Sequence, residues 1–459
     1  MIGANTCDQR SGLSKTLFLG LCLVASFCLY NFAPSSMTEM MRRSAALFLL
    51  GGLLWTFEVL PLHAVSLTLV LLHIVFLSKE GAGLGASAIS YQEFLRPFAS
   101  PVIMLFFGGF VLSRAMTKHG VAQYLAARIL APFARSSFLF LTVLTGITVF
   151  LSMWMSNTAA AAMLLAILMP AIRQNRPEPF HKALILAVAF GTSLGGIATP
   201  IGTPPNAMAM AALRESGHVM TFADWMAAGL PVTLLLSALM IASLYVFFPP
   251  QSSFTLDLSA GKTLPLSPQG WITASAAAAA IGLWLTQPFH GLDESLPALG
   301  AAAFLTCTGL LDRDDLNSLE WDVLILMWGG LVLSQGMMLS GLAAWLGGLS
   351  WESLDPAGRT AAVAALGIFL SLFMSNTASA GLMIPLAIAA GGPGREISSA
   401  FLAATATSLA VALPISTPPN AMAFACGGLR SSDMMKPGLV LTLGGFAILL
   451  LAEHFLIGL

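Results

Sequence analysis

Phe150-Leu-Ser-Met-Trp-Met-Ser-Asn-Thr158 is the stretch of sequence that decides the fold, because it recurs 219 residues later as Phe369-Leu-Ser-Leu-Phe-Met-Ser-Asn-Thr377. Each copy is followed by a second shared phrase, Pro200-Ile-Gly-Thr-Pro-Pro-Asn-Ala-Met-Ala209 in the first half and Pro414-Ile-Ser-Thr-Pro-Pro-Asn-Ala-Met-Ala423 in the second. Polar and helix-breaking residues are costly at membrane depth unless they line a cavity or a binding site. Two such pairs, one in each half, are the pattern expected of a transporter built from internal repeats.

The composition is that of a membrane protein with many spans. Hydrophobic residues make up 57% of the 459 residues and charged residues 9%, whereas a soluble domain carries roughly 25% charged residues. Apolar runs long enough to span a bilayer recur along the whole chain, which predicts an all-α membrane protein embedded in the lipid bilayer. The net charge of −1 and the lack of a basic cluster give no indication of a nucleic-acid partner, and we expect none.

The apolar segments have the same order in both halves of the chain. In the first half we expect helices at about 16–33, 44–60, 62–78 and 97–116, an interfacial stretch at 118–132, a hairpin at 136–172, a broken helix at 182–216 and a helix at 224–248. In the second half we expect helices at 271–287, 295–311 and 321–340, an interfacial stretch at 341–352, a hairpin at 357–391, a broken helix at 397–428 and a last helix at 434–457. These segments predict about 11 transmembrane helices and two hairpins, divided into an N-terminal helix within 1–43, repeat 1 at 44–248, a polar linker at 249–270 and repeat 2 at 271–459.

Both hairpins are expected to be re-entrant, so that each dips to the middle of the membrane and returns. The stretch 136–172 is too long for one span and too short for two spans and a loop, since a span needs roughly 20 residues. Three prolines and a glycine break the next helix at Ala198–Pro205, and we place the second break at Leu413–Pro419. Each repeat then has an odd number of crossings, which inverts repeat 2 relative to repeat 1.

The distribution of basic residues gives the expected orientation. With the N-terminus in the cytoplasm, 13 of the 20 Lys and Arg residues fall inside and 7 outside, and this excess favours an N-terminus inside and a C-terminus outside. We expect the protein in the cytoplasmic (inner) membrane, with the first hairpin opening from the cytoplasm and the second from outside. The apolar stretch Lys15–Ala33 is interpreted as a retained helix, because it lacks an obvious small-residue cleavage site.

Each hairpin tip exposes two kinds of helix end. The first arm ends in unpaired carbonyls, and the second arm begins with unpaired N–H groups. Carbonyls, serine hydroxyls and asparagine amide oxygens suit a small cation, whereas the N–H end suits a carboxylate or another oxyanion. Ser156 or Thr158 is expected to cap the returning helix of the first hairpin, and Ser375 or Thr377 that of the second. Neither motif contains Lys or Arg, so we expect co-bound cations to supply the positive charge.

Other interpretations of these residues are weaker or stay open. A single Ser-Asn-Thr is more often a contact between membrane helices, but its recurrence with the Pro-Pro phrase in both halves favours a binding site. The glycine pairs at 108–109 and 329–330 also correspond, and we interpret them as close helix contacts. Glu58 and His63 lie at a turn between helices, either as locally satisfied polar groups or as a proton relay. An intramembrane enzyme would need a nucleophile–base pair or a metal cluster at depth, and the broken helices favour alternating access over a passive channel.

The paired Ser-Asn-Thr motifs, the Thr-Pro-Pro-Asn breaks and the segment Trp55–Leu62 resemble the divalent anion:sodium symporter (DASS) family, and the resemblance covers essentially the whole chain. Members of that family carry di- and tricarboxylates or, in some branches, sulfate. The resemblance implies a homodimer in which a transport domain moves against a scaffold domain as an elevator. It implies a first sodium site at Ser152, Ser156, Asn157 and Gly202, and a second at Ser371, Met374, Asn376 and Ser416. It implies substrate contacts from Asn157, Thr158, Thr203, Asn376, Thr377, Thr417 and Pro418.

We therefore expect a transporter, not an enzyme, that couples Na+ to the symport of small di- and tricarboxylates of the succinate, malate and fumarate class. Some relatives with similar motifs are sodium-independent exchangers, so a dicarboxylate exchanger is the first alternative. A carrier of sulfate or another inorganic anion is the second. The segment Glu58–His63 departs from the pattern of small residues that is usual in the family, which leaves the role of that turn open.

Overall fold

The computed structural model describes residues 4–81, 89–174, 178–250, 265–348 and 354–456, and every regular element within these ranges is a helix. The first half consists of α1 (Ala4–Phe32), α2 (Glu39–Thr56), α3 (Leu62–Leu77), α4 (Gln92–Leu95), η1 (Arg96–Ala99), α5 (Pro101–Lys118), α6 (Val121–Leu130), η2 (Ala131–Phe133), α7 (Ser137–Ser152), α8 (Asn157–Gln174), α9 (Pro179–Ile197), α10 (Pro204–Glu215) and α11 (Phe222–Phe247). The second half consists of α12 (Pro268–Leu285), α13 (Gln287–His290), α14 (Ser295–Cys307), α15 (Arg313–Asn317), α16 (Trp321–Leu339), α17 (Leu342–Gly347), α18 (Pro356–Ser371), α19 (Asn376–Gly391), α20 (Glu396–Ser408), α21 (Pro418–Ala425) and α22 (Ser431–Leu456). Most of the linker expected at 249–270 lies outside the described residues.

The helices agree with a chain that crosses a membrane many times. By length and composition, five stretches of the described chain are able to span a bilayer: Gln92–Lys118, α9, α11, α16 and Ser431–Glu453. Shorter apolar helices accompany them, including α3, α7, α14, α18 and α19. An α-helix of 16 residues, the length of α7, α18 and α19, is about 24 Å long, less than the roughly 30 Å hydrocarbon core of a bilayer.

The duplicated motifs lie where the helices are interrupted. The first Ser-Asn-Thr separates α7 from α8, and the second separates α18 from α19, so both expected hairpins are pairs of helices. The Pro-Pro phrases begin α10 and α21, with proline in the first turn of each helix, a position where the missing N–H has no intrahelical partner to lose.

The second break is longer than expected. We placed it at Leu413–Pro419, but α20 already ends at Ser408. A side chain spans this longer break: Asn420 Nδ2 donates to the carbonyls of Val411 and Leu413 at 2.9 and 3.0 Å. Those carbonyls are satisfied without a helical N–H, so the chain can leave the helix early.

Six helices, which we call the frame helices (α2, α3, α5, α12, α14 and α16), pack in a repeated pattern. α5 lies against α14, and α16 lies against α3 in the corresponding way. A Cβ on Gly108 of α5 would stand 2.5 Å from the Cβ of Ala298, and one on Gly329 of α16 would stand 2.5 Å from the Cβ of Ser66. The expected close helix contacts are confirmed at Gly108 and Gly329, one glycine of each pair.

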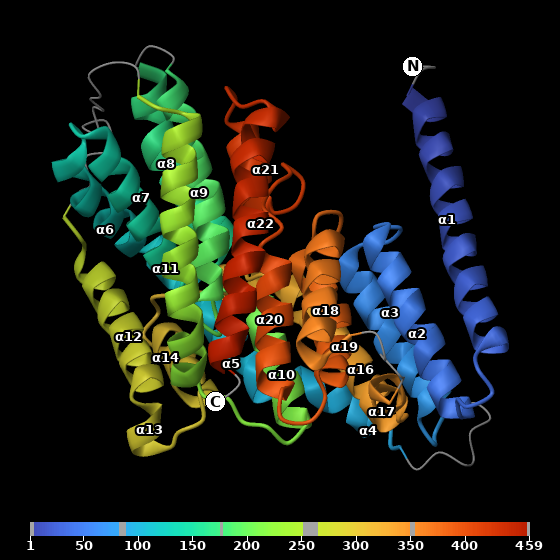
Figure 1. Ribbon diagram of the computed structural model, residues 1–459. Coiled ribbons are helices and arrows are strands. Elements are labelled where there is room, and N and C mark those ends of the chain that lie inside the picture. The colour runs from blue at the N-terminus through green and yellow to red at the C-terminus, as the bar shows by residue number, and fades with distance from the viewer. Residues whose placement is uncertain (1–3, 82–88, 175–177, 251–264, 349–353, 457–459) are drawn as a thin grey trace.

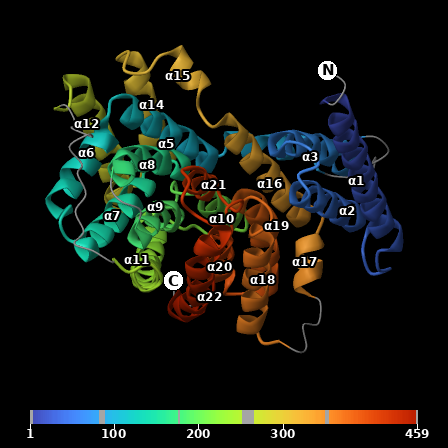
Figure 2. The same ribbon diagram turned by 90° about the horizontal axis from the view of Figure 1, so that it is seen from above.

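The helices α7–α11 and α18–α22 form what we call the hairpin helices. Half of each broken helix packs on the other half of the chain: α10 contacts α19 and α20, whereas α21 contacts α8 and α9. Figure 1 shows α1 at one edge beside α2 and α3, and Figure 2 shows α10 and α21 together near the middle of the molecule. α9 is enclosed by protein, because 94% of an apolar stretch of 18 residues in this helix is buried. The two motifs are brought together by this exchange of half-helices.

Candidate functional site

The two hairpin tips and the two breaks line one cavity of about 340 Å³. Its lining contains all the expected substrate contacts: Asn157, Thr158, Thr203, Asn376, Thr377, Thr417 and Pro418. From the expected sodium sites it also contains Ser156, Gly202 and Ser416. Ser152, Ser371 and Met374 are not part of the lining and are buried. Residues that are 219 positions apart in the sequence therefore share one space.

The first tip is tied to the break that follows it. Ser152 Oγ donates to the carbonyl of Thr192 at 2.8 Å. In the amide orientation that satisfies its neighbours, Asn157 Nδ2 donates to Ser152 Oγ at 2.6 Å and to the carbonyl of Gly202 at 3.2 Å. Asn157 thus connects the start of α8 to the break between α9 and α10. Three of the four residues of the expected first sodium site take part in this network, and Ser156 does not.

The second tip repeats the serine contacts of the first. Ser371 Oγ lies 2.7 Å from the carbonyl of Thr407 and 2.7 Å from Asn376 Oδ1. Ser375 caps α19, because its side chain accepts a hydrogen bond from the N–H of Ala378 at 3.1 Å. The expected cap of the second hairpin is confirmed.

Ser156, at the first tip, is used differently from Ser375. Its hydroxyl donates to Glu320 Oε1 at 2.5 Å, and its backbone N–H donates to Ser113 Oγ at 3.4 Å. Glu320 directly precedes α16, and Ser113 belongs to α5. The first tip is therefore in contact with two frame helices.

Two buried asparagines hold the breaks open, and the sequence analysis gave them no role. Asn206 Nδ2 donates to the carbonyls of Gly196 and Thr199, each at 2.8 Å. Asn420 makes the corresponding contacts across the second break, as described above, and both side chains are fully buried. Their signal in the sequence was the identical position in both Thr-Pro-Pro-Asn phrases, and the structure shows that they satisfy carbonyls left free by the missing helical turns.

The cavity also contains charged residues that the motifs did not reveal. Glu320 and Asp322 line it from the start of α16, and His63 lines it from the start of α3. Glu58 is not part of the lining; it occupies the turn before α3 with a φ of 45°, an unusual backbone conformation for a residue other than glycine. The turn that we left open therefore contributes the imidazole of His63 to the cavity.

The arrangement suits an anion bound together with cations. α8 and α19 begin at the cavity, and the unpaired N–H groups of a helix start favour an oxyanion. α10 and α21 each begin with two prolines, which offer carbonyls but no N–H. Among the described residues that line the cavity, none is Lys or Arg. An anion there depends on helix starts, hydroxyls, amides and any positive charge that arrives with it.

Comparison with known protein families agrees with this site. The family model described as "Citrate transporter" matches residues 52–413. An uncharacterized transporter of Haemophilus influenzae is 34% identical, over 95% of this chain and 95% of its own. The sodium-dependent dicarboxylate transporter SdcS of Staphylococcus saprophyticus is 29% identical, over 93% of this chain and 88% of its own. The chain therefore belongs to the citrate transporter family, consistent with its resemblance to the divalent anion:sodium symporters.

Solved structures share the fold. The crystal structure of the Alcanivorax borkumensis YdaH transporter superposes with a TM-score of 0.56 at 15% identity, over 89% of this chain and 97% of that one. The protein is a multi-pass membrane transporter, and its family and relatives are transporters and not enzymes.

Proposed function

We propose that this protein is a secondary active symporter that couples Na+ to the uptake of small di- and tricarboxylates of the succinate, malate and fumarate class. The observation that carries this proposal is one cavity shared by both motifs, with two helix starts for carboxylates and no Lys or Arg among its described lining residues. An anion in such a cavity needs added positive charge, and sodium is the cation named for the SdcS relative.

The sodium sites proposed are those at the two tips. The first comprises Ser152, Ser156, Asn157 and Gly202, and the second comprises Ser371, Met374, Asn376 and Ser416. Hydroxyl, amide and carbonyl oxygens are the hard ligands that such a cation prefers. The close approach of Asn157 to Ser152 and Gly202, and of Asn376 to Ser371, supports both assignments.

The proposed mechanism is an elevator in an inverted-repeat homodimer. The hairpin helices form the transport domain, the frame helices form the scaffold, and the short arms α7, α18 and α19 end inside the bilayer. The N-terminus lies in the cytoplasm and the C-terminus outside, in the cytoplasmic membrane. The packing of α5 on α14 and of α16 on α3 among the frame helices, and of α7 on α9 and of α18 on α19 among the hairpin helices, supports this division.

The test is uptake of labelled succinate into proteoliposomes with an inward sodium gradient. Uptake that requires sodium and is lost in potassium or choline is the expected result. Equal uptake in all three cations, stimulated by internal dicarboxylate, would replace symport by exchange. Uptake of sulfate but not succinate would replace the carboxylate substrate by an inorganic anion.

A further inference from the structure

The cavity has an acidic side that a carrier of anions does not need. Glu320 is half-buried and its carboxylate is held by Ser156 Oγ at 2.5 Å, and Asp322 lies two residues further along the start of α16, exposed at the cavity. Asp322 belongs to a frame helix and Glu320 directly precedes that helix, whereas Ser156 belongs to a hairpin tip. The carboxylate of Glu320 is therefore next to the start of α8, and Asp322 lines the same cavity.

The charges of Glu320 and Asp322 act against an anion in proportion to the charge of that anion. Coulomb repulsion is linear in the ligand's charge and is weakly screened in a cavity partly lined by apolar groups. Phe106, Phe110 and Leu326 provide such apolar lining. The helix starts and co-bound sodium attract every carboxylate, but each added ligand charge also meets two fixed carboxylates.

We propose that Glu320 and Asp322 restrict the substrate to at most two net negative charges, so that the carrier takes dicarboxylates and discriminates against tricarboxylates. This inference rests on the proposed function and narrows its substrate class. The substrate class proposed here differs from citrate, the tricarboxylate named in the description of the family model. A purely structural role for Glu320, as a hydrogen-bond acceptor for Ser156, would act equally on all substrates.

The test compares competitors that carry one, two and three net negative charges at pH 7.5: L-aspartate, succinate and citrate. Each competes with labelled succinate in proteoliposomes at saturating sodium, for the wild type, Glu320→Gln and Asp322→Asn. We expect each variant to lower the half-inhibiting concentration of citrate about fivefold, that of succinate about threefold and that of aspartate the least. Comparing each ligand with itself across variants removes the effect of ligand size.

The matched control is Asp314→Asn, which removes an exposed acidic charge of α15 that does not line the cavity. It is expected to leave the citrate-to-succinate ratio at the wild-type value. Asp322→Asn keeps the test decisive if Glu320→Gln does not fold, because Asp322 is exposed. A citrate-to-succinate ratio unchanged in the variants, with normal succinate uptake, would overturn this inference and leave the symport proposal standing. A wild type that carries none of the three ligands would overturn both.

Discussion

At the scale of single residues, Asn157 and Asn376 join each tip to the cavity. We expect Asn157→Ala and Asn376→Ala each to abolish succinate uptake, because each removes an amide that contacts a tip serine and lines the cavity. Uptake assays together with size-exclusion profiles in detergent separate lost transport from lost folding. Asn31→Ala is the control, since Asn31 is exposed and donates only to the carbonyl of Phe27 within α1. Normal transport by both variants would refute the site assignment.

Asn206 and Asn420 are expected to act on stability. Replacing either by Leu leaves buried carbonyls at a break without a donor, at a cost of about 1–3 kcal/mol for each unsatisfied group. We expect both variants to unfold at clearly lower temperature in detergent than the wild type, whereas Asn31→Ala should not. An unchanged unfolding temperature would mean that the breaks hold their shape without these amides.

At the scale of elements, the contact of α5 with α14 depends on one glycine of a pair. A Cβ on Gly108 would lie 2.5 Å from the Cβ and from the carbonyl oxygen of Ala298, but a Cβ on Gly109 would meet nothing closer than 3.8 Å. We therefore expect Gly108→Ala to destabilise the protein by about 1–3 kcal/mol through overpacking, with little effect from Gly109→Ala. Thermal unfolding of the two variants checks this, and equal effects would contradict the packing of α5 on α14.

The elements also show what the sequence could predict. The hairpins, the breaks and most helix ends follow from prolines, polar motifs and the length of apolar runs, which are local properties. The end of α20 at Ser408 was missed because the carbonyls near and beyond it are satisfied by side chains distant in the sequence, among them Ser371, Thr442 and Asn420. The place of Glu320 in the cavity was missed for the same kind of reason, since it depends on how α16 packs against the first tip, a contact over 164 residues.

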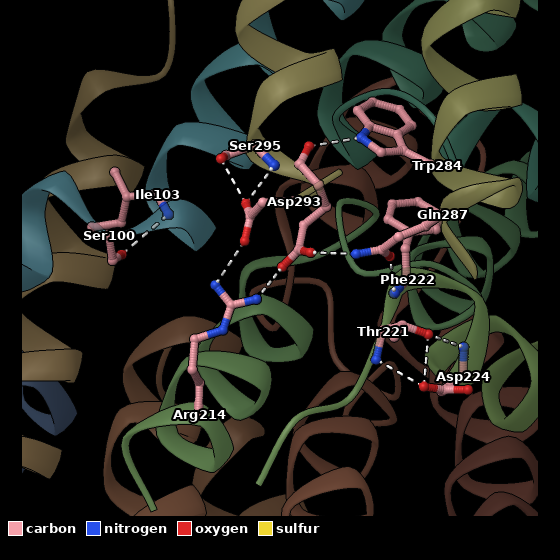
Figure 3. A network of polar contacts seen from close by, with 11 residues as sticks. Ser100, Ile103, Arg214, Thr221, Phe222, Asp224, Trp284, Gln287, Asp293 and Ser295 are labelled. Carbon is pink, nitrogen blue, oxygen red and sulfur yellow. Dashed lines mark hydrogen bonds and ion pairs between the residues drawn. The ribbon is translucent and has the colours of Figure 1, made fainter. Parts of the chain in front are cut away.

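At the scale of the whole molecule, one ion-pair network joins the hairpin helices to the frame helices. Arg214, at the end of α10, bonds to Asp293 at 3.3 Å and to Glu294 at 2.8 Å, just before α14. Gln287 donates to the other carboxylate oxygen of Glu294 at 3.2 Å. Figure 3 shows that Arg214 extends toward Asp293 and Gln287. The carboxylate of Glu294 is only 1% exposed, so it depends on these partners for its charge to be tolerated.

An elevator motion would have to break this network in every cycle, which makes Arg214 a test of the mechanism. Arg214→Met leaves a buried carboxylate unpaired, and we expect a loss of about 3–5 kcal/mol of stability, seen as a lower unfolding temperature. The double variant Arg214→Met with Glu294→Gln removes both charges and should recover most of that loss. Arg96→Met, which breaks an exposed pair with Glu93, is the control and should cost under about 1 kcal/mol. If the network only stabilises one position of the transport domain, the double variant should carry succinate at least as fast as the wild type. A stable but inactive double variant would show that the Arg214–Glu294 pair is needed for transport itself.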